Sequence, residues 1–218
     1  CKRHGVIFHT DAVQAFGHIP LNVEQMHIDL LSVSGHKIHG PKGIGFLYIK
    51  EKTKIRPISF GGDQQKGMRS GTINVPGIAG LGVAAAEAYA HLAENAEHMY
   101  ELKAYFADKL QQIGDVTING KAGHDSAPQI ISASFLGVRS EVLLHSLEDR
   151  CIYVSAGSAC SSNHPSQSGT LLNIGLDHAH QESTLRFSFC PETTREELDY
   201  TYGVLEELLP MLRRYTRH

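Results

Sequence analysis

The sequence of 218 residues carries no excess of basic charge and no long apolar run. Its 20 Lys and Arg residues against 23 Asp and Glu residues give a formal net charge of −3. This balance leaves no basic footprint for nucleic acid or an anionic membrane. No apolar run approaches the roughly 20 residues that a bilayer-spanning helix needs. We therefore expect no nucleic acid and no membrane among its partners, and consider small molecules or proteins instead.

Cysteine is sparse, and the four cysteines, at positions 1, 151, 160 and 190, form no C-x-x-C pair. This is not the cysteine density of a secreted disulfide scaffold, which indicates reduced thiols in a cytoplasmic protein. The 14 histidines include no H-E-x-x-H motif and no zinc-finger spacing. We expect no metal site, and interpret most histidines as surface or locally hydrogen-bonded side chains.

The first residues, "CKRHGVIFHTDAVQ", include no initiator methionine and no signal-peptide pattern. They enter a strand-like run almost at once, so we expect that an N-terminal part is absent from the chain. The composition, with 41% hydrophobic and 20% charged residues, is that of a globular protein.

Polar side chains follow two short apolar runs near the start. The runs "GVIFHTDA" (5–12) and "IDLLSVSGHK" (28–37) predict buried strands that deliver Asp11 and Lys37 just past their ends, and "IGFLYIK" (44–50) predicts a third strand. In an α/β fold, ligands bind at the carboxyl ends of strands. Asp11 and Lys37 are therefore candidate site residues.

The remaining sequence predicts an interface loop, a long helix and a second α/β region. A glycine-rich stretch, "SFGGDQQKGMRSGTINVPG" (59–77), is followed by one helix from Pro76 to about residue 113. Strands are expected at 127–137, 151–157 and 183–189, with a helix at 140–150 and a final helix that opens on the capping box Thr194–Glu197 and runs until Pro210 disturbs it. We place a domain boundary near residue 90, giving domains 1–90 and 91–218.

A lysine beside apolar strands suits Schiff-base chemistry, because desolvation disfavours its charged form. The alternative is that Lys37 extends from the strand end to water. A pyridoxal 5'-phosphate (PLP) cofactor needs a carboxylate at its pyridinium nitrogen and donors for its phosphate and phenolate oxygens. The neighbours of Lys37 that could meet these needs are Asp11, Gln14, Ser34 and His36.

The motifs "FHTDAVQAFG", "DLLSVSGHKIHGPKGIGFLY", "GMRSGT", "VSAGSACSS" and "LRFSF" together resemble those of cysteine desulfurases of the NifS/IscS type, in the class V aminotransferase superfamily. The resemblance runs from residue 1 to the C-terminal helix. It implies a fold-type I PLP-dependent transferase, of which this chain holds the C-terminal part of the large PLP-binding domain and the small C-terminal α/β domain. It also implies a homodimer that passes sulfur from L-cysteine to acceptor proteins such as an iron–sulfur scaffold.

The resemblance implies a role for each matching residue. Lys37 carries PLP, Asp11 contacts the pyridine nitrogen and Gln14 lies near the phenolate oxygen. Ser34 and His36 bind the phosphate, and His36 also belongs to the catalytic group. Thr72 reaches the phosphate of the partner subunit, and Arg186 clamps the substrate carboxylate, as a planar bidentate donor can. For Arg186, the alternative is a surface ion pair.

Cys160 lies in "SAGSACSSNHPSQSG", whose small and polar residues are typical of a loop. A free cysteine is more often a small buried hydrophobe, but this neighbourhood argues against burial. We interpret Cys160 as the thiolate that takes the substrate sulfur as a persulfide. Cys151 and Cys190 lie in strand-like runs and are interpreted as structural.

Two other interpretations stay open at this stage. One is another class V PLP enzyme, such as a selenocysteine lyase or an aminotransferase, although an aminotransferase has no need for a nucleophilic thiol. The other is a catalytically silent fragment that acts as a binding scaffold.

Overall fold

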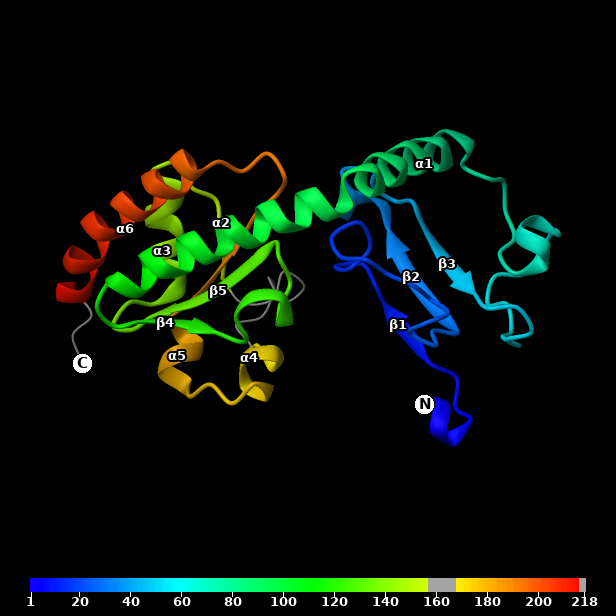
Figure 1. Cartoon of the computed structure of the whole chain (residues 1–218), viewed down its shortest axis with the longest axis horizontal. Helices are drawn as coiled ribbons and strands as arrows, with labels where there is room; N and C mark the ends of the chain where they lie inside the picture. The colour runs from blue at the N-terminus through cyan, green and yellow to red at the C-terminus, as the bar shows by residue number, and fades with distance from the viewer. Residues whose placement is uncertain (157–167, 216–218) are drawn as a thin grey trace. The chain divides into compact units, whose positions relative to one another are not determined.

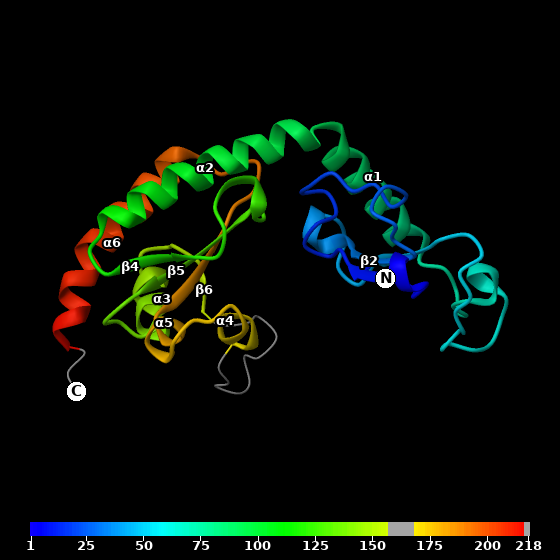
Figure 2. The same cartoon turned by 60° about the horizontal axis from the view of Figure 1, so that its bottom comes forward.

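A computed structural model of the chain describes residues 1–156 and 168–215. The chain divides into two compact units, Cys1–Glu94 and Asn95–His218 (Figures 1 and 2). The elements alternate between helices and short strands in both units, which confirms the predicted α/β class. No helix of the described residues is long and apolar enough to cross a membrane.

The first unit is built on a three-stranded sheet in the order β1-β2-β3, in which β1 and β2 run parallel and β2 and β3 antiparallel. Its elements, in chain order, are η1 (Lys2–His4), β1 (His9–Asp11), β2 (Leu30–Ser34), η2 (Gly35–Ile38), β3 (Gly45–Ile49), η3 (Gln64–Gly67) and α1 (Val75–Ala90).

Side chains along β2 alternate between buried and partly exposed positions. Leu31 and Val33 are buried and form a small core with Ala12 and Ile28, as expected where every second side chain faces one side of a sheet. The start of β3 approaches β2 so closely that a Cβ on Gly45 would lie 2.2 Å from the Val33 carbonyl oxygen. Only glycine allows this approach, which keeps the end of β2 and the following η2 in a tight arrangement.

The predicted buried strand at 5–12 is wrong in extent and in burial. Only His9–Asp11 form β1, with His9 and Asp11 exposed, and Val6 and Ile7 are 58% and 52% exposed. Among the described residues, β1 pairs with β2 alone, so nothing covers its outer edge and the flanking residues gain little from extending the ladder.

The second unit contains a four-stranded antiparallel sheet in the order β4-β5-β7-β6. Its elements, in chain order, are α2 (Leu92–Gln112), β4 (Val116–Asn119), η4 (Gly123–Asp125), β5 (Ile130–Phe135), α3 (Ser140–Glu148), β6 (Ser155–Ala156), α4 (Gly169–Asn173), α5 (His178–Glu182), β7 (Thr184–Ser188) and α6 (Arg195–Tyr215).

One face of this sheet forms a large apolar core with α2, α3 and α6. On α2 the buried residues Met99, Leu102, Phe106 and Leu110 recur at three- or four-residue spacing, which places them on one helix face. The Phe106 ring packs edge-on against Phe187 of β7 at 5.3 Å between centroids. The unit therefore has a continuous core of its own.

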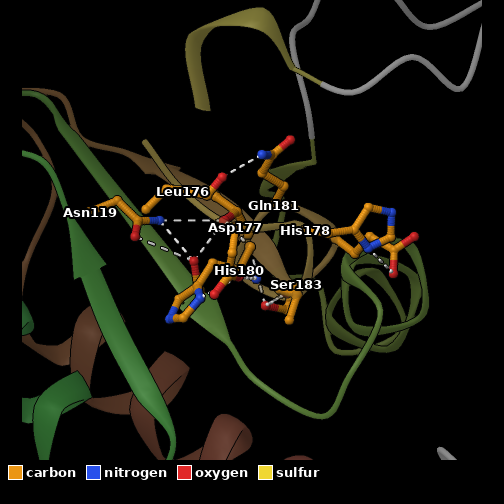
Figure 3. A network of polar contacts seen from close by, with 11 residues as sticks. Asn119, Leu176, Asp177, His178, His180, Gln181 and Ser183 are labelled. Carbon is orange, nitrogen blue, oxygen red and sulfur yellow. Dashed lines mark hydrogen bonds and ion pairs between the residues drawn. The ribbon is translucent and has the colours of Figure 1, made fainter. Parts of the chain in front are cut away.

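The opposite face of the same sheet is polar. The Ser134 hydroxyl of β5 is buried and lies 2.8 Å from the Thr184 hydroxyl of β7, and Asn119 Nδ2 of β4 donates to Ser134 Oγ at 2.9 Å. Thr184 in turn donates to the carbonyl of His180 on α5 at 2.6 Å. Figure 3 shows this network, which attaches α5 to the sheet by hydrogen bonds.

The predicted single helix from residue 76 is wrong, because it breaks at His91 into α1 and α2. The final helix is confirmed at its start: Thr194 N donates to Glu197 Oε2 at 2.9 Å and Glu197 N donates to Thr194 Oγ1 at 3.3 Å, a capping box. Pro210 does not end it, since α6 continues to Tyr215. The buried Leu208 and Leu209 hold this part of α6 on the core.

The predicted strand at 151–157 is also shorter than expected. Of the described residues 151–156, only Ser155–Ala156 pair with β7, and Cys151 is an exposed turn residue with φ 59°. The prediction that Cys151 lies in a strand is therefore wrong. Cys190 is half-buried just beyond β7, with its sulfur 3.5 Å from Thr193 Oγ1.

Candidate active site

Two parallel strands bring Asp11 and Ser34 to the same edge of the first sheet. Asp11 ends β1 and pairs with Ser32 in the register of β2, and Ser34 ends β2 two residues further on. One carboxylate oxygen of Asp11 accepts the Val13 N–H at 3.0 Å. The exposed Asp11 side chain makes no other polar contact among the described residues. Its second oxygen is thus available to a ligand. Gln14 is exposed in the turn that follows.

The segment after β2 carries the next candidates. Ser34 Oγ and His36 Nδ1 lie 2.8 Å apart, and Lys37 follows within η2. A hydroxyl and an imidazole joined in this way form a pair that can donate N–H and O–H bonds to a phosphate. Asp11, Ser34, His36 and Lys37 are therefore placed by β1, β2 and η2 of one unit.

Lys37 differs from Lys103, a buried lysine of the second unit. Lys37 is half-buried, and its amine has no hydrogen bond or ion pair among the described residues. Burial lowers the pKa of Lys103, but its amine donates to Ser126 Oγ at 2.6 Å and to the Ala127 carbonyl at 2.7 Å. Lys103 holds a loop, whereas the Lys37 amine is available for chemistry.

Sequence reasoning missed His18, which lies near Lys37 in the first unit. Burial lowers the pKa of His18, and the positive charges of His39 and Lys37 lower it further, against a raising effect of the bond from its Nδ1–H to the Phe16 carbonyl at 3.2 Å. The neutral imidazole is therefore favoured. No motif signalled this residue.

The glycine-rich loop places Thr72 in an exposed position before α1. Ser70 Oγ donates to the Gly62 carbonyl at 2.7 Å and the Gly71 N–H donates to Gln64 Oε1 at 3.1 Å. Gly71 adopts φ 113°, which disfavours any other residue there. Both hydrogen bonds are made between residues of the loop itself, and the Thr72 side chain is exposed to solvent.

Arg186 belongs to the second unit, in the middle of β7. It is half-buried on the polar face of the sheet, opposite to the buried Leu185 and Phe187. Its Nη2 donates to Ser155 Oγ of β6 at 3.2 Å. Its Nε is buried and has no partner among the described residues. The ion-pair alternative finds no support here, since none of the described ion pairs includes Arg186.

Cys160, the predicted nucleophile, lies outside the described residues. Sequence reasoning also missed the polar network of Asn119, Ser134 and Thr184. The signal was present in "IISASF" (130–135), where serines alternate with buried apolar residues and indicate a strand with one polar face.

Other candidate sites are few. Among residues 1–156 and 168–215, no group of His, Cys, Asp and Glu side chains is arranged to hold a metal ion. A cavity of about 180 Å³ in the second unit is lined by Tyr100, Lys103, Ile118 and Lys121, among others. None of the residues predicted to act in catalysis lines this cavity.

Known proteins similar to this chain identify its family. The chain matches the family described as "Aminotransferase class-V" over residues 1–201. It is 42% identical over 215 residues to "Cysteine desulfurase IscS" of Dictyoglomus turgidum, covering 97% of this chain and 54% of that protein. It is also 42% identical to "Cysteine desulfurase, mitochondrial" of Eremothecium gossypii, covering 98% of this chain and 43% of that protein.

A solved structure titled "NIFS-LIKE PROTEIN" has 37% identity and a TM-score of 0.85, over 97% of this chain and 54% of that one. The chain thus spans about half the length of the curated relatives that it matches. Because the family match extends over most of the chain, the chain belongs to the class V aminotransferase family.

Proposed function

We propose that this chain is part of a PLP-dependent cysteine desulfurase, which converts L-cysteine to L-alanine and transfers the sulfur. The observation that carries the proposal is Lys37, a half-buried lysine at the sheet edge that also holds Asp11 and the Ser34–His36 pair. Its amine makes no hydrogen bond or ion pair within residues 1–156 and 168–215. The names of relatives at 42% identity support the choice of reaction.

The residues present fit PLP by the chemistry of their donors. Lys37 offers an amine to the aldehyde, and the free oxygen of Asp11 suits a protonated pyridine nitrogen. Ser34 and His36 offer donors to a phosphate, Gln14 a contact to the phenolate oxygen, and Thr72 a contact to the phosphate of a partner subunit. When bound, PLP supplies the electron sink that stabilises negative charge at the substrate Cα.

Each of the chain's own site residues has a separate role in the proposed reaction. The Lys37 amine would hold PLP and, when not bonded to it, would be able to carry a proton, and His36 would be a second proton-handling group beside it. Arg186 orients the substrate through its carboxylate. Cys160 takes the sulfur as a persulfide and passes it to an acceptor protein such as an iron–sulfur scaffold. We further propose a homodimer in the cytoplasm.

The first experiment asks where PLP attaches. The chain is incubated with PLP, reduced with borohydride, digested and mapped by mass spectrometry, alongside Lys37→Ala and Lys42→Ala. Lys42 is an exposed lysine five positions later and serves as the matched control. We expect one pyridoxyl group on Lys37, lost in Lys37→Ala and kept in Lys42→Ala. Labelling scattered over exposed lysines would contradict the proposal for this chain.

The second experiment tests the reaction with L-cysteine and with selenocysteine. Alanine and sulfide are measured for the parent protein and for Cys160→Ser. We expect cysteine turnover that Cys160→Ser abolishes, with Lys37 still labelled. Sulfide released at an undiminished rate by Cys160→Ser would refute the role of Cys160, and turnover of selenocysteine alone would indicate a selenocysteine lyase.

A further inference from the structure

We propose that Ser155 is a positioning residue, which holds the Arg186 guanidinium so that its remaining N–H groups face the carboxylate of an amino acid. The inference rests on the proposed function for the identity of the ligand. It concerns only the second unit, where both residues are described.

The strand register places Ser155 beside Arg186. The two residues are Cα partners in the β6–β7 ladder, so their side chains project from the same face of the sheet. Arg186 Nη2 donates to Ser155 Oγ at 3.2 Å. This bond takes up one N–H of the five that a guanidinium carries and fixes the rotation of its plane.

The second observation is the Nε of the same guanidinium. It is buried and has no hydrogen-bond partner among the described residues. A buried donor of a charged group left without a partner is costly, so a fold retains one only where it has a use. A carboxylate that accepts two parallel N–H bonds from a guanidinium supplies that partner.

Ser132 serves as the comparison for Ser155, because it lies beside Arg186 on the opposite neighbouring strand. Ser132 is the Cα partner of Arg186 on the other side, in β5, but its hydroxyl accepts a hydrogen bond from Asn119 Nδ2 at 3.3 Å. The two serines flank one arginine on neighbouring strands, and a hydrogen bond to the guanidinium is described for Ser155. Ser132→Ala is therefore a matched control.

Ser155 also affects ligand choice. An arginine held by a hydroxyl presents its free N–H groups in one orientation and so discriminates between an amino acid and the amine that lacks the carboxylate. Without the hydroxyl, the guanidinium loses orientational order and the carboxylate is bound less well, whereas binding of the amine is unaffected.

The test follows the Nε–Hε NMR signal of Arg186 in the ¹⁵N-labelled chain, assigned with Arg186→Lys. The signal is titrated with L-alanine and with ethylamine, which lacks the carboxylate. We expect L-alanine to shift the signal and ethylamine to leave it in place. Ser155→Ala should weaken L-alanine binding about three- to tenfold, the loss of roughly one ordinary hydrogen bond. Ser155→Thr, which keeps the hydroxyl, and Ser132→Ala should each bind within about twofold of the parent, an effect of less than one such bond.

Each outcome decides the proposal. Parent-like affinity and parent-like order of the Arg186 signal in Ser155→Ala would overturn it, as would a parent chain whose Arg186 signal ignores L-alanine. If Ser155→Ala does not fold, Ser155→Cys takes its place, because a thiol of similar size is a weak acceptor. Failure of the proposed function appears elsewhere, as absent PLP labelling of Lys37, and leaves the Arg186 titration interpretable.

Discussion

The two units of this chain carry their candidate site residues on hydrophobic cores of very different size. The first unit carries Lys37 and Asp11 on a three-stranded sheet whose core cluster has four buried residues, Ala12, Ile28, Leu31 and Val33. The second unit carries Arg186 on a four-stranded sheet packed against α2, α3 and α6, with a buried apolar core on one face and a hydrogen-bonded polar face on the other. The candidate lysine thus lies on the less enclosed unit.

Exposed apolar side chains repeat this contrast. In the first unit, Ile58, just before the glycine-rich loop, is 94% exposed, Phe60 within that loop is 82% exposed, and Val83 of α1 is 71% exposed. Among the described residues of the second unit, the most exposed aliphatic side chain is Leu172, at 55%, and the apolar side chains exposed beyond that are those of Tyr153 and Tyr215. Apolar surface of this extent is typical of a surface that another part of an assembly covers. The first unit should therefore depend more on its partners than the second.

The largest effect should come from matched leucine truncations. Leu205→Ala removes a fully buried side chain from the large core, and Leu31→Ala removes one that is 3% exposed from the small cluster. Leucine-to-alanine changes cost about 2–5 kcal/mol, depending on how far the site can collapse. We expect Leu205→Ala near the upper end and Leu31→Ala near the lower, measured by denaturant unfolding with amide exchange in β5 and β2.

Equal losses for these two variants would contradict the comparison, because they would mean that both cores constrain their leucines alike. Val142→Ala, at a 48% exposed position of α3, serves as the control and should change the free energy of unfolding by less than either.

A smaller effect is expected from the polar face of the second unit. Ser134→Ala leaves the Asn119 amide and the Thr184 hydroxyl with one partner fewer in a buried place. Leaving a buried polar group unsatisfied costs about 1–3 kcal/mol. Thermal unfolding should show that loss, and the double change Ser134→Ala with Thr184→Val should cost less than the sum of the single changes, since both remove the same bond.

The capping box of α6 should contribute about 1 kcal/mol. Thr194→Ala removes the hydroxyl that accepts the Glu197 N–H and should lower the free energy of unfolding by that amount. Thr194→Ser keeps an oxygen at the same place and should be close to the parent in the same denaturant titration. A loss as large in the serine variant would show that the methyl group, and not the cap, matters.

On acidification, the two units should lose stability at different pH values. The pKa of His18 is lowered in the first unit, mainly by burial, and the pKa of Asp177 is lowered in the second, mainly by the backbone N–H of His180. For both groups, the contribution to the free energy of unfolding is fully present above the unfolded pKa and is lost as the pH falls through the folded pKa. A histidine titrates at higher pH than an aspartate, so the first unit should weaken first.

Amide exchange across a pH series measures this order. We expect protection in β2 to fall at a higher pH than protection around α5, and His18→Gln to remove that early loss. Asp177→Asn keeps a side-chain oxygen that accepts the His180 N–H but does not titrate. Amide protection around α5 should therefore depend less on pH in this variant. Simultaneous loss in both units would contradict the assignment.

Local sequence patterns predicted much of this molecule. The apolar run "IDLLSVSGHK" (28–37) predicted a strand here, and β2 forms over Leu30–Ser34, before the chain turns into η2 at Gly35. The pair Thr194 and Glu197 predicted the start of α6, because capping is decided within one turn. Asp11 and Lys37 were expected just past strand ends; Asp11 is instead the last residue of β1, whereas Lys37 does follow β2, in η2.

Tertiary structure decided what local patterns could not. The run at 5–12 is apolar enough for a strand, but its length depends on how many strands pair with it, and only three residues pair here. Pro210 breaks isolated helices, yet α6 continues because Leu208 and Leu209 are buried against distant elements. The partner of Arg186 lies 31 positions earlier in the chain, so only the β6–β7 register brings Ser155 Oγ to it. By itself the sequence determined the residue types and the local conformations that chemistry here requires. Pairing and burial between residues far apart in the chain determined which of those residues are enclosed, paired or free to act.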